Sequence, residues 1–172
     1  MELAQPVSAE KIGTPFGSLN ILVTADLQPV IIGAGFGSLT ELTTRVLSQR
    51  PGLQIKRQKI PKPIADVFQD WLAGNFLALD TLKVDQGGSK FRQDCWRAMR
   101  QIKPGKAISY SELAKKTSSP AAVRAAATAC AQNLIAPIIP CHRIIKTDGS
   151  LGRYGYGESV KRKLLEFEGV DL

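Results

Sequence analysis

The first 88 residues alternate between short apolar runs and stretches with apolar residues at helical spacing. Residues 16–36 hold two apolar runs around the polar segment 24–29, a pattern that predicts a β-hairpin. Ser38 followed by Glu41 forms a capping-box pattern, which predicts a helix running to about Val46. The remaining elements expected in this half are strands at 53–60 and 79–84 and a helix at 62–75. This half is therefore expected to be an α/β domain.

The pattern becomes mainly helical after Gly87-Gly88, a pair typical of a linker. We therefore expect two domains, an α/β domain at 1–88 and a mainly α domain at 89–172. Helices are expected at 89–102, 111–117, 120–132 and about 159–167. Cys95 lies on the apolar side of the first of these helices, where a cysteine most often fills the core.

The two middle helices of this half begin with capping signals and are joined by a tight turn. Ser109 and Glu112 form a capping box, and Ser119 can cap the next helix with Pro120 at its first position. Short helices joined in this way are a candidate helix-turn-helix. The second of them holds seven alanines, and Arg124 is its only charged residue. An alanine-rich face with one long cation fits docking against nucleic acid, although an ordinary exposed arginine is the alternative.

The charge of the chain is concentrated in the same half. Residues 1–88 hold 8 Lys/Arg and 8 Asp/Glu, whereas residues 89–172 hold 15 Lys/Arg and 7 Asp/Glu, a net charge of +8. A basic balance by itself can serve solubility. Its segregation into one half favours a polyanionic partner for that half.

Several classes of protein do not fit the sequence. No run approaches the roughly 18 apolar residues of a membrane span. The N-terminal stretch is neither a signal peptide nor a transit peptide, so a cytoplasmic protein is expected, or a nuclear one in a eukaryote. Three cysteines and one histidine lack the spacing of a disulfide framework or a zinc site, and no metal or cofactor is expected.

The only histidine, His142, directly follows Cys141. A histidine can act as the base for a thiol, but adjacent residues face each other only in a tight turn or through a bridging water. Its orienting carboxylate would be Glu168, or Glu166 as the less favoured choice. Glu168 stands at the C-terminus of a helix ended by Gly169, where a carboxylate opposes the helix dipole. A buried, inert cysteine is the alternative to this nucleophilic site.

These motifs together resemble the O6-alkylguanine-DNA alkyltransferase family, also called methylated-DNA–protein-cysteine methyltransferases. The resemblance covers residues 91–169 in the right order. It is carried by the segments Ile108-Ser109-Tyr110, Arg124, Asn133, Pro140-Cys141-His142-Arg143-Ile144-Ile145 and Glu168-Gly169. Over residues 1–88 it is limited to an α/β pattern similar to the family's ribonuclease-H-like N-terminal domain.

The resemblance implies repair by a single irreversible transfer of an alkyl group from guanine O6 to Cys141. It implies catalytic roles for Cys141, His142, Glu168, Tyr110 and Asn133. The alanine-rich helix would enter the minor groove of double-stranded DNA. The residues in contact with the DNA would be Arg124, Tyr110, Ala125, Ala122 and Ser111. The flipped base would occupy a pocket formed by Cys141, Ile144, Tyr154, Gly155, Tyr156 and Cys130. A monomer is expected.

Three positions depart from the family pattern. Gly155 stands where some members have serine, Tyr156 where some have glycine, and Leu134 where a proline is common. The bulk of Tyr156 could narrow the pocket against large adducts. Three other functions stay open: a damage sensor that does not repair, a helix-turn-helix transcription factor and a cysteine hydrolase. Cys141 argues against the sensor, and the shortage of polar side chains on the alanine-rich helix argues against the transcription factor.

Overall fold

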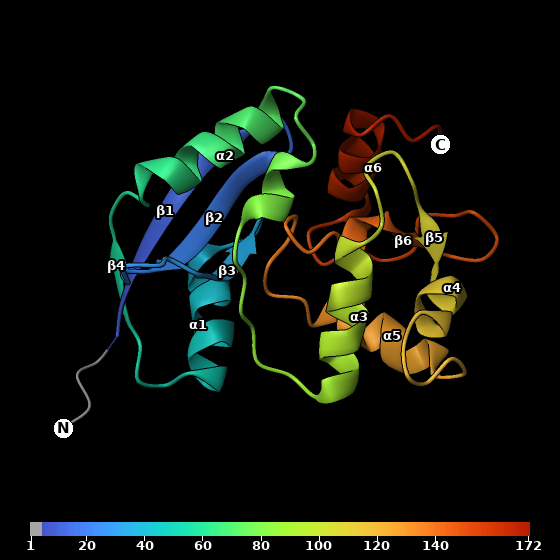
Figure 1. Ribbon diagram of the computed structural model, residues 1–172. Helices are drawn as coiled ribbons and strands as arrows, with labels where there is room; N and C mark the ends of the chain where they lie inside the picture. Colours follow the sequence, from blue (N-terminus) through green and yellow to red (C-terminus); the bar gives the residue numbers. More distant parts are fainter. Residues whose placement is uncertain (1–4) are drawn as a thin grey trace. The chain divides into compact units, whose positions relative to one another are not determined.

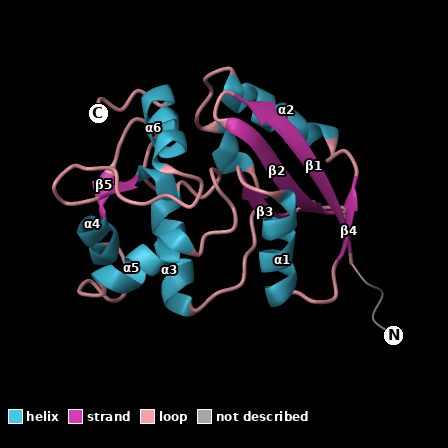
Figure 2. Cartoon of the chain, turned by 180° about the vertical axis from the view of Figure 1, so that it is seen from behind, coloured by secondary structure: helices cyan, strands magenta, loops and turns pink. Residues whose placement is uncertain are grey.

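The chain folds into two compact units in a computed structural model, of which residues 5–172 are described (Figures 1 and 2). Unit 1 comprises the chain up to Gly87 together with Leu134–Ala136, and unit 2 comprises Gly88–Asn133 and Pro137–Leu172. The expected domains, 1–88 and 89–172, differ from these units in one respect: the sequence places Leu134–Ala136 in the second domain, whereas the structure places it in unit 1. Residues 1–4, part of the stretch considered as a targeting signal, lie outside the described residues.

Unit 1 is built on a four-stranded sheet with the order β3-β2-β1-β4. Its strands are β1 (Pro6–Thr14), β2 (Gly17–Thr24), β3 (Ile31–Gly35) and β4 (Gln54–Arg57). The pairs β1–β2 and β2–β3 are antiparallel, whereas β1–β4 is parallel. The β2–β3 hairpin was expected, but β1 was not. The charged residues Glu10 and Lys11 interrupt the apolar positions of β1, and only tertiary pairing makes the strand evident.

Three helical segments accompany the sheet: α1 (Leu39–Gln49), α2 (Lys62–Leu72) and the 3₁₀-helix η1 (Ala78–Thr81). The Ser38 side chain caps α1 as expected, and the helix runs three residues beyond Val46. The strand expected at 79–84 is wrong, because its first residues form η1 and only Val84 bridges to β3. The buried residues Leu79 and Leu82 are three apart, which suits a 3₁₀ turn.

The short segment Leu134–Ala136 extends the sheet of unit 1 beside β3. Ala34 donates its backbone N–H to Leu134 O over 2.7 Å and accepts from Ala136 N over 3.0 Å. Gln86 Oε1 accepts from Leu134 N at 2.8 Å. These bonds hold the backbone that leads from the end of α5 towards Cys141.

Unit 2 is mainly helical, with two very short strands. Its elements are α3 (Lys90–Arg100), β5 (Ile108–Ser109), α4 (Tyr110–Lys115), α5 (Val123–Ala131), η2 (Cys141–Arg143), β6 (Ile144–Ile145) and α6 (Glu158–Phe167). Ser109 and Glu112 form the expected capping box at the start of α4. The helix expected from Pro120 begins later, at Val123, because residues 120–121 form a turn instead. None of the described helices is long and apolar enough to span a membrane.

Alanines give α5 a close fit within unit 2. Ala126 and Ala129 are fully buried, and the Ala129 carbonyl accepts a hydrogen bond from Trp96 Nε1 of α3 at 2.9 Å. Arg124 and Ala125 are exposed on another side of the same helix. These two alanines are core residues that allow α3 and α5 to approach closely, whereas the docking face expected on this helix stays a prediction for its exposed residues. Cys95 is fully buried in α3, which confirms its role as core filler.

Candidate active site

Cys141 and His142 lie in a single 3₁₀ turn rather than in a strand. The turn η2 is closed by the Arg143 N–H, which donates to Pro140 O at 3.0 Å, and it leads into β6. Strand β6 pairs in parallel with β5, with Ile145 opposite Ser109. The tight turn that the adjacent Cys and His required is therefore present. Cys141 is 7% exposed and His142 is fully buried.

The imidazole of His142 is oriented by Glu168, the residue at the C-terminal end of α6. His142 Nε2 lies 3.0 Å from Glu168 Oε1. Burial lowers the pKa of His142, so the ring is neutral near pH 7 and Nε2 carries the proton that it donates to the carboxylate. Nδ1 is buried and has no hydrogen-bond partner among residues 5–172. The ring therefore presents a basic nitrogen with its lone pair uncommitted.

Arg143 holds the carboxylate of Glu168 in place. Its Nε and Nη2 atoms each lie 2.9 Å from one oxygen of Glu168, and Nη1 donates to the Ile102 carbonyl. Burial opposes ionisation of Glu168, but His142 and Arg143 together lower its pKa to about 2. The fork-to-fork pair explains how a carboxylate can stand at a helix C-terminus. Sequence reasoning chose Glu168 but assigned Arg143 no role, although it belongs to the Pro-Cys-His-Arg segment.

Asn133 joins the end of α5 to the cysteine turn. Its Nδ2 donates to Ile139 O at 2.8 Å and contacts Cys141 Sγ at 3.3 Å. Burial raises the pKa of Cys141, while the Asn133 hydrogen bond and the charge of Lys161 oppose that rise. The resting group is therefore a thiol that needs a base, and Asn133 and Lys161 favour the thiolate once it forms.

Lys161 is a buried cation that sequence reasoning missed. Its side chain is fully buried, and Nζ donates to the carbonyls of Ile144 and Leu151, each at 2.5 Å. Nζ also lies 6.0 Å from the centre of the Tyr110 ring. The signal was its position in α6, where it shares a helix face with the buried residues Leu164, Leu165 and Glu168. A lysine on the apolar face of a helix indicates a specific partner.

Tyr110, Cys130 and Tyr154 lie close enough to Cys141 for their charges to interact. Burial, with a smaller effect from the nearby Cys130 and Cys141, raises the pKa of Tyr110 to about 12. Tyr154 and Tyr156 pack edge to face with their ring centres 5.4 Å apart. Tyr154 Oη is buried without a hydrogen-bond partner in the described chain.

The backbone carbonyls of Cys141 and Ile144, two residues of the expected base pocket, already accept hydrogen bonds. Cys141 O accepts from the Ile144 N–H, and Ile144 O accepts from Lys161. A carbonyl has a second lone pair, so each keeps one acceptor position. Gly155 has no atom within 4 Å of the place where a Cβ would stand, so it leaves open space beside the tyrosines.

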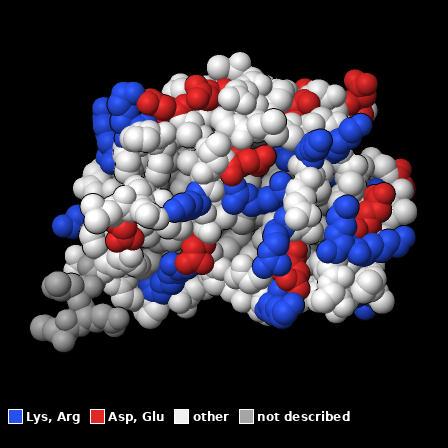
Figure 3. All heavy atoms as spheres, viewed as in Figure 1, with Lys and Arg blue, Asp and Glu red and all other residues white. Residues whose placement is uncertain are grey.

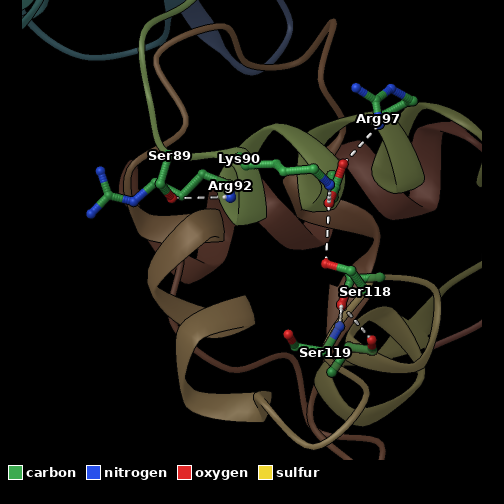
Figure 4. Close-up of polar contacts among 9 residues, drawn as sticks. Ser89, Lys90, Arg92, Arg97, Ser118 and Ser119 are labelled. Carbon is green, nitrogen blue, oxygen red and sulfur yellow. Dashed lines mark hydrogen bonds and ion pairs between the residues drawn. The ribbon is translucent and has the colours of Figure 1, made fainter.

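The residues expected to contact DNA lie in α4 and α5, except Ala122, which is the N-cap residue of α5. Arg124 and Ala125 are exposed on α5, whereas Ala122 and Ser111 are half-buried. Ser118, in the turn between the two helices, contacts Asp94 of α3 at 3.3 Å, and Asp94 also binds Lys90 and Arg97 (Figure 4). This cluster ties the turn to α3. Lysine and arginine side chains lie over the part of unit 2 that includes β5 and α4, with acidic side chains among them (Figure 3).

Comparison with known proteins shows which family the chain resembles. Residues 90–170 match the model for the 6-O-methylguanine DNA methyltransferase DNA-binding domain. The methylated-DNA–protein-cysteine methyltransferase of Salmonella typhimurium is 32% identical over 164 residues, covering 95% of this chain and 96% of the relative. The Mycobacterium bovis protein of the same name is 40% identical over 103 residues, covering 60% of this chain and 62% of the relative.

Solved structures agree with these sequence relatives. Mycobacterium tuberculosis OGT in complex with DNA superposes with a TM-score of 0.74 at 30% identity, covering 94% of this chain and 92% of that one. The O6-methylguanine methyltransferase of the same organism has a TM-score of 0.72 at 29% identity, with the same coverage. The chain belongs to the methylated-DNA–protein-cysteine methyltransferase family.

Proposed function

We propose that the protein repairs DNA by moving an alkyl group from O6 of guanine to the sulfur of Cys141, once per molecule. The observation that carries this proposal is the buried arrangement of Cys141 with the neutral His142, whose Nε2 is held by Glu168 at 3.0 Å. A nucleophile beside a base, with the base oriented by a third group, is the general signature of an activated thiol.

The first step is removal of the thiol proton. His142 Nδ1 accepts it through a bridging water, and the resulting imidazolium is stabilised by the ionised Glu168. Asn133 and Lys161 stabilise the thiolate, the first by its contact with Sγ at 3.3 Å and the second by its charge. Arg143 takes no part in the proton transfer and keeps the carboxylate in position.

The second step is an in-line displacement. The Cys141 thiolate attacks the alkyl carbon, a C–S bond forms as the bond from carbon to O6 breaks, and the electron pair stays on guanine. Tyr110, whose pKa is about 12, then protonates N3 of the departing base. The base lies between Tyr154, Tyr156, Gly155, Cys130 and Ile144. The thioether has no leaving group that would return the thiol, so each molecule acts once.

Access to the base requires it to leave the DNA stack, at a cost of a few kcal/mol. We infer that α4, the turn and α5 form a helix-turn-helix whose second helix enters the minor groove. Arg124 would fill the space left by the base, Ala122 and Ala125 would allow close approach, and Ser111 and Tyr110 would contact the backbone. The exposed positions of Arg124 and Ala125 support this assignment.

The proposal also includes the fold family of unit 1, the oligomeric state and the cellular location. The meander β1–β2–β3 followed by α1 and the parallel strand β4 supports a ribonuclease-H-like assignment for unit 1. We infer a monomer that acts on double-stranded DNA carrying O6-alkylguanine, in the cytoplasm or, in a eukaryote, the nucleus.

The test is intact-protein mass spectrometry after mixing the protein with a duplex that carries one O6-methylguanine. The expected result is a gain of one methylene unit per molecule, mapped to Cys141 and absent in Cys141→Ala. Cys130→Ser is the matched control. Cys130 lies near the same site but is not expected to accept the methyl group, so this variant should still gain the mass at Cys141.

Other outcomes point to other functions. Tight binding to the methylated duplex without a mass gain would indicate a damage sensor. Repeated turnover of a thioester substrate without DNA would indicate a hydrolase.

A further inference from the structure

The loop between β6 and α6 and the first turns of α6 enclose a hollow in unit 2 that the proposed reaction does not use. Its volume is about 540 Å³, and its lining includes Lys146, Arg153, Tyr154, Glu158, Arg162 and Leu172. Tyr154 is the only member of the expected base pocket that lines it, and Cys141 does not. We call it the basic hollow, because three cations and one carboxylate side chain meet there.

The cations of the basic hollow are largely uncommitted. Within the described residues, the side chains of Lys146 and Arg153 have no hydrogen bond or ion pair, although the charge of Lys146 helps to lower the pKa of Asp148 in the same loop. Arg162 has only a 3.7 Å contact with the exposed Glu158. Exposed pairs of this kind contribute little. By contrast, Lys90 and Arg97 on α3 share the carboxylate of Asp94 at 3.1 and 2.9 Å (Figure 4). The basic hollow therefore keeps charge available for an external anion.

The loop that carries Lys146 and Arg153 is held by its own hydrogen bonds. Lys146 N donates to Ser150 O at 2.9 Å, and Asp148 Oδ1 accepts from both N and Oγ of Ser150 at 2.9 and 2.6 Å. A loop ordered before binding loses less conformational entropy when a ligand arrives.

The basic hollow adjoins a residue expected to contact the DNA backbone. Gly152 has φ +74°, and a Cβ there would stand 3.3 Å from Tyr110 Oη and 3.4 Å from Lys146 Cγ. The Tyr110 hydroxyl and the Lys146 stem thus flank the same glycine. A strand whose phosphate lies at Tyr110 can extend past this glycine towards the cations.

We propose that the basic hollow binds a backbone phosphate of the DNA strand next to the flipped nucleotide, through Lys146, Arg153 and Arg162. This inference rests on the proposed function, in which DNA is the substrate. Such contacts carry no base information, but they fix the position of the strand and add to affinity through release of counterions.

The experiment measures binding of an undamaged duplex by fluorescence anisotropy across salt concentrations, for the full chain and for Arg153→Gln and Arg162→Gln. Each variant is expected to lower the slope of log affinity against log salt by about 1 and to weaken binding roughly five- to tenfold at 0.1 M salt. Lys163→Gln is the matched control. It removes one exposed positive charge from the neighbouring position of α6, which does not line the basic hollow.

Slopes and affinities of the two arginine variants equal to those of Lys163→Gln would overturn the proposal, because net charge alone would then account for the change. Unfolding temperatures are measured for all variants, and Arg153→Lys is expected to keep most of the slope. The two proposals fail separately. Absence of methyl uptake by the unmodified chain counts against the proposed function, whereas the salt slope on undamaged DNA judges the phosphate contact.

Discussion

The two units differ in what they bury. Among the residues of unit 1 that the structure describes, from residue 5 onward, the buried polar ones are all uncharged: Ser8, Asn20, Thr24 and Gln86. In unit 2 they are Asn133, His142, Arg143, Lys161 and Glu168, three of which carry full charges. The halves of the chain differ in the same sense, since the excess charge of +8 falls after residue 88.

This difference separates stability from chemistry. Removing charges from water costs several kcal/mol for each ion, and an apolar core of similar volume is often as stable or more so. Unit 1 shows that this chain can build such a core, around Phe68, Trp71 and Leu22. We therefore attribute the buried charges of unit 2 to the proposed alkyl transfer rather than to stability.

The largest effect is expected from Glu168→Gln. The substitution leaves Arg143 buried without its charge partner, so unfolding should become easier by about 3–5 kcal/mol. It also removes the carboxylate that stabilises the His142 imidazolium, so single-turnover methyl transfer should slow about a hundredfold. Chemical denaturation and quenched mass spectrometry measure the two quantities.

Phe68→Ala in unit 1 is the matched control. Phe68 is fully buried, and its truncation should also cost about 3–5 kcal/mol. Its transfer rate per folded molecule should stay near that of the unmodified chain. Equal losses of rate in both variants would remove the contrast between the units.

The next largest effect is expected from low pH, which should reduce the free energy of unfolding by protonating His142 and Glu168. The folded pKa of His142 is below 6.5, so its contribution to stability is full above pH 6.5 and falls as protons bind the unfolded chain below it. The pKa of Glu168 falls from 4.5 to about 2, so its contribution, roughly 3 kcal/mol, is present above pH 4.5 and is lost between there and pH 2. Urea denaturation from pH 8 to pH 3 should show both declines.

Glu168→Gln supplies the check on this assignment. It should flatten the decline below pH 4.5, because a glutamine does not titrate. An unchanged acid decline in that variant would assign it to other carboxylates.

Sequence reasoning succeeded where the determinants are local. Capping residues located the starts of α1 and α4, and Glu168 was chosen because its place at a helix end is unfavourable without a partner. The start of α5 was placed three residues early, since Pro120 suits either a first helical turn or the tight turn that it forms.

The rest depends on contacts between distant residues. Strand β1 is defined by its pairing with β2 and β4, and the segment at 79–84 became a 3₁₀ turn because both of its leucines face a core. The carbonyl partners of Lys161 come from β6 and the following loop, 17 and 10 residues away. No local pattern specifies those contacts, and the three-residue addition to the unit 1 sheet is equally non-local.

Alanine substitutions of one buried asparagine in each unit should have smaller effects. Asn133 donates to Ile139 O and contacts Cys141 Sγ, while Asn20 donates to the carbonyls of Gly35 and Gly37. Asn133→Ala and Asn20→Ala should each cost about 1–3 kcal/mol. Only Asn133→Ala should slow methyl transfer, by about tenfold, since it alone contacts the sulfur. A comparable slowing in Asn20→Ala would show that the rate responds to stability in general.

The smallest effects are expected at two helix caps. Ser38 Oγ accepts from Glu41 N at the start of α1, and Ser109 Oγ accepts from Glu112 N at the start of α4. Replacing either serine by alanine should cost about 1 kcal/mol. Ser109→Ala should in addition weaken DNA binding two- to threefold, because Tyr110 is the first residue of α4 and frays with it. Ser38→Ala should leave binding unchanged, and anisotropy on the same duplex measures both. Equal binding by the two variants would mean that the start of α4 is held by the β5–β6 pairing rather than by its cap, so that the local signal for this helix is not what positions Tyr110.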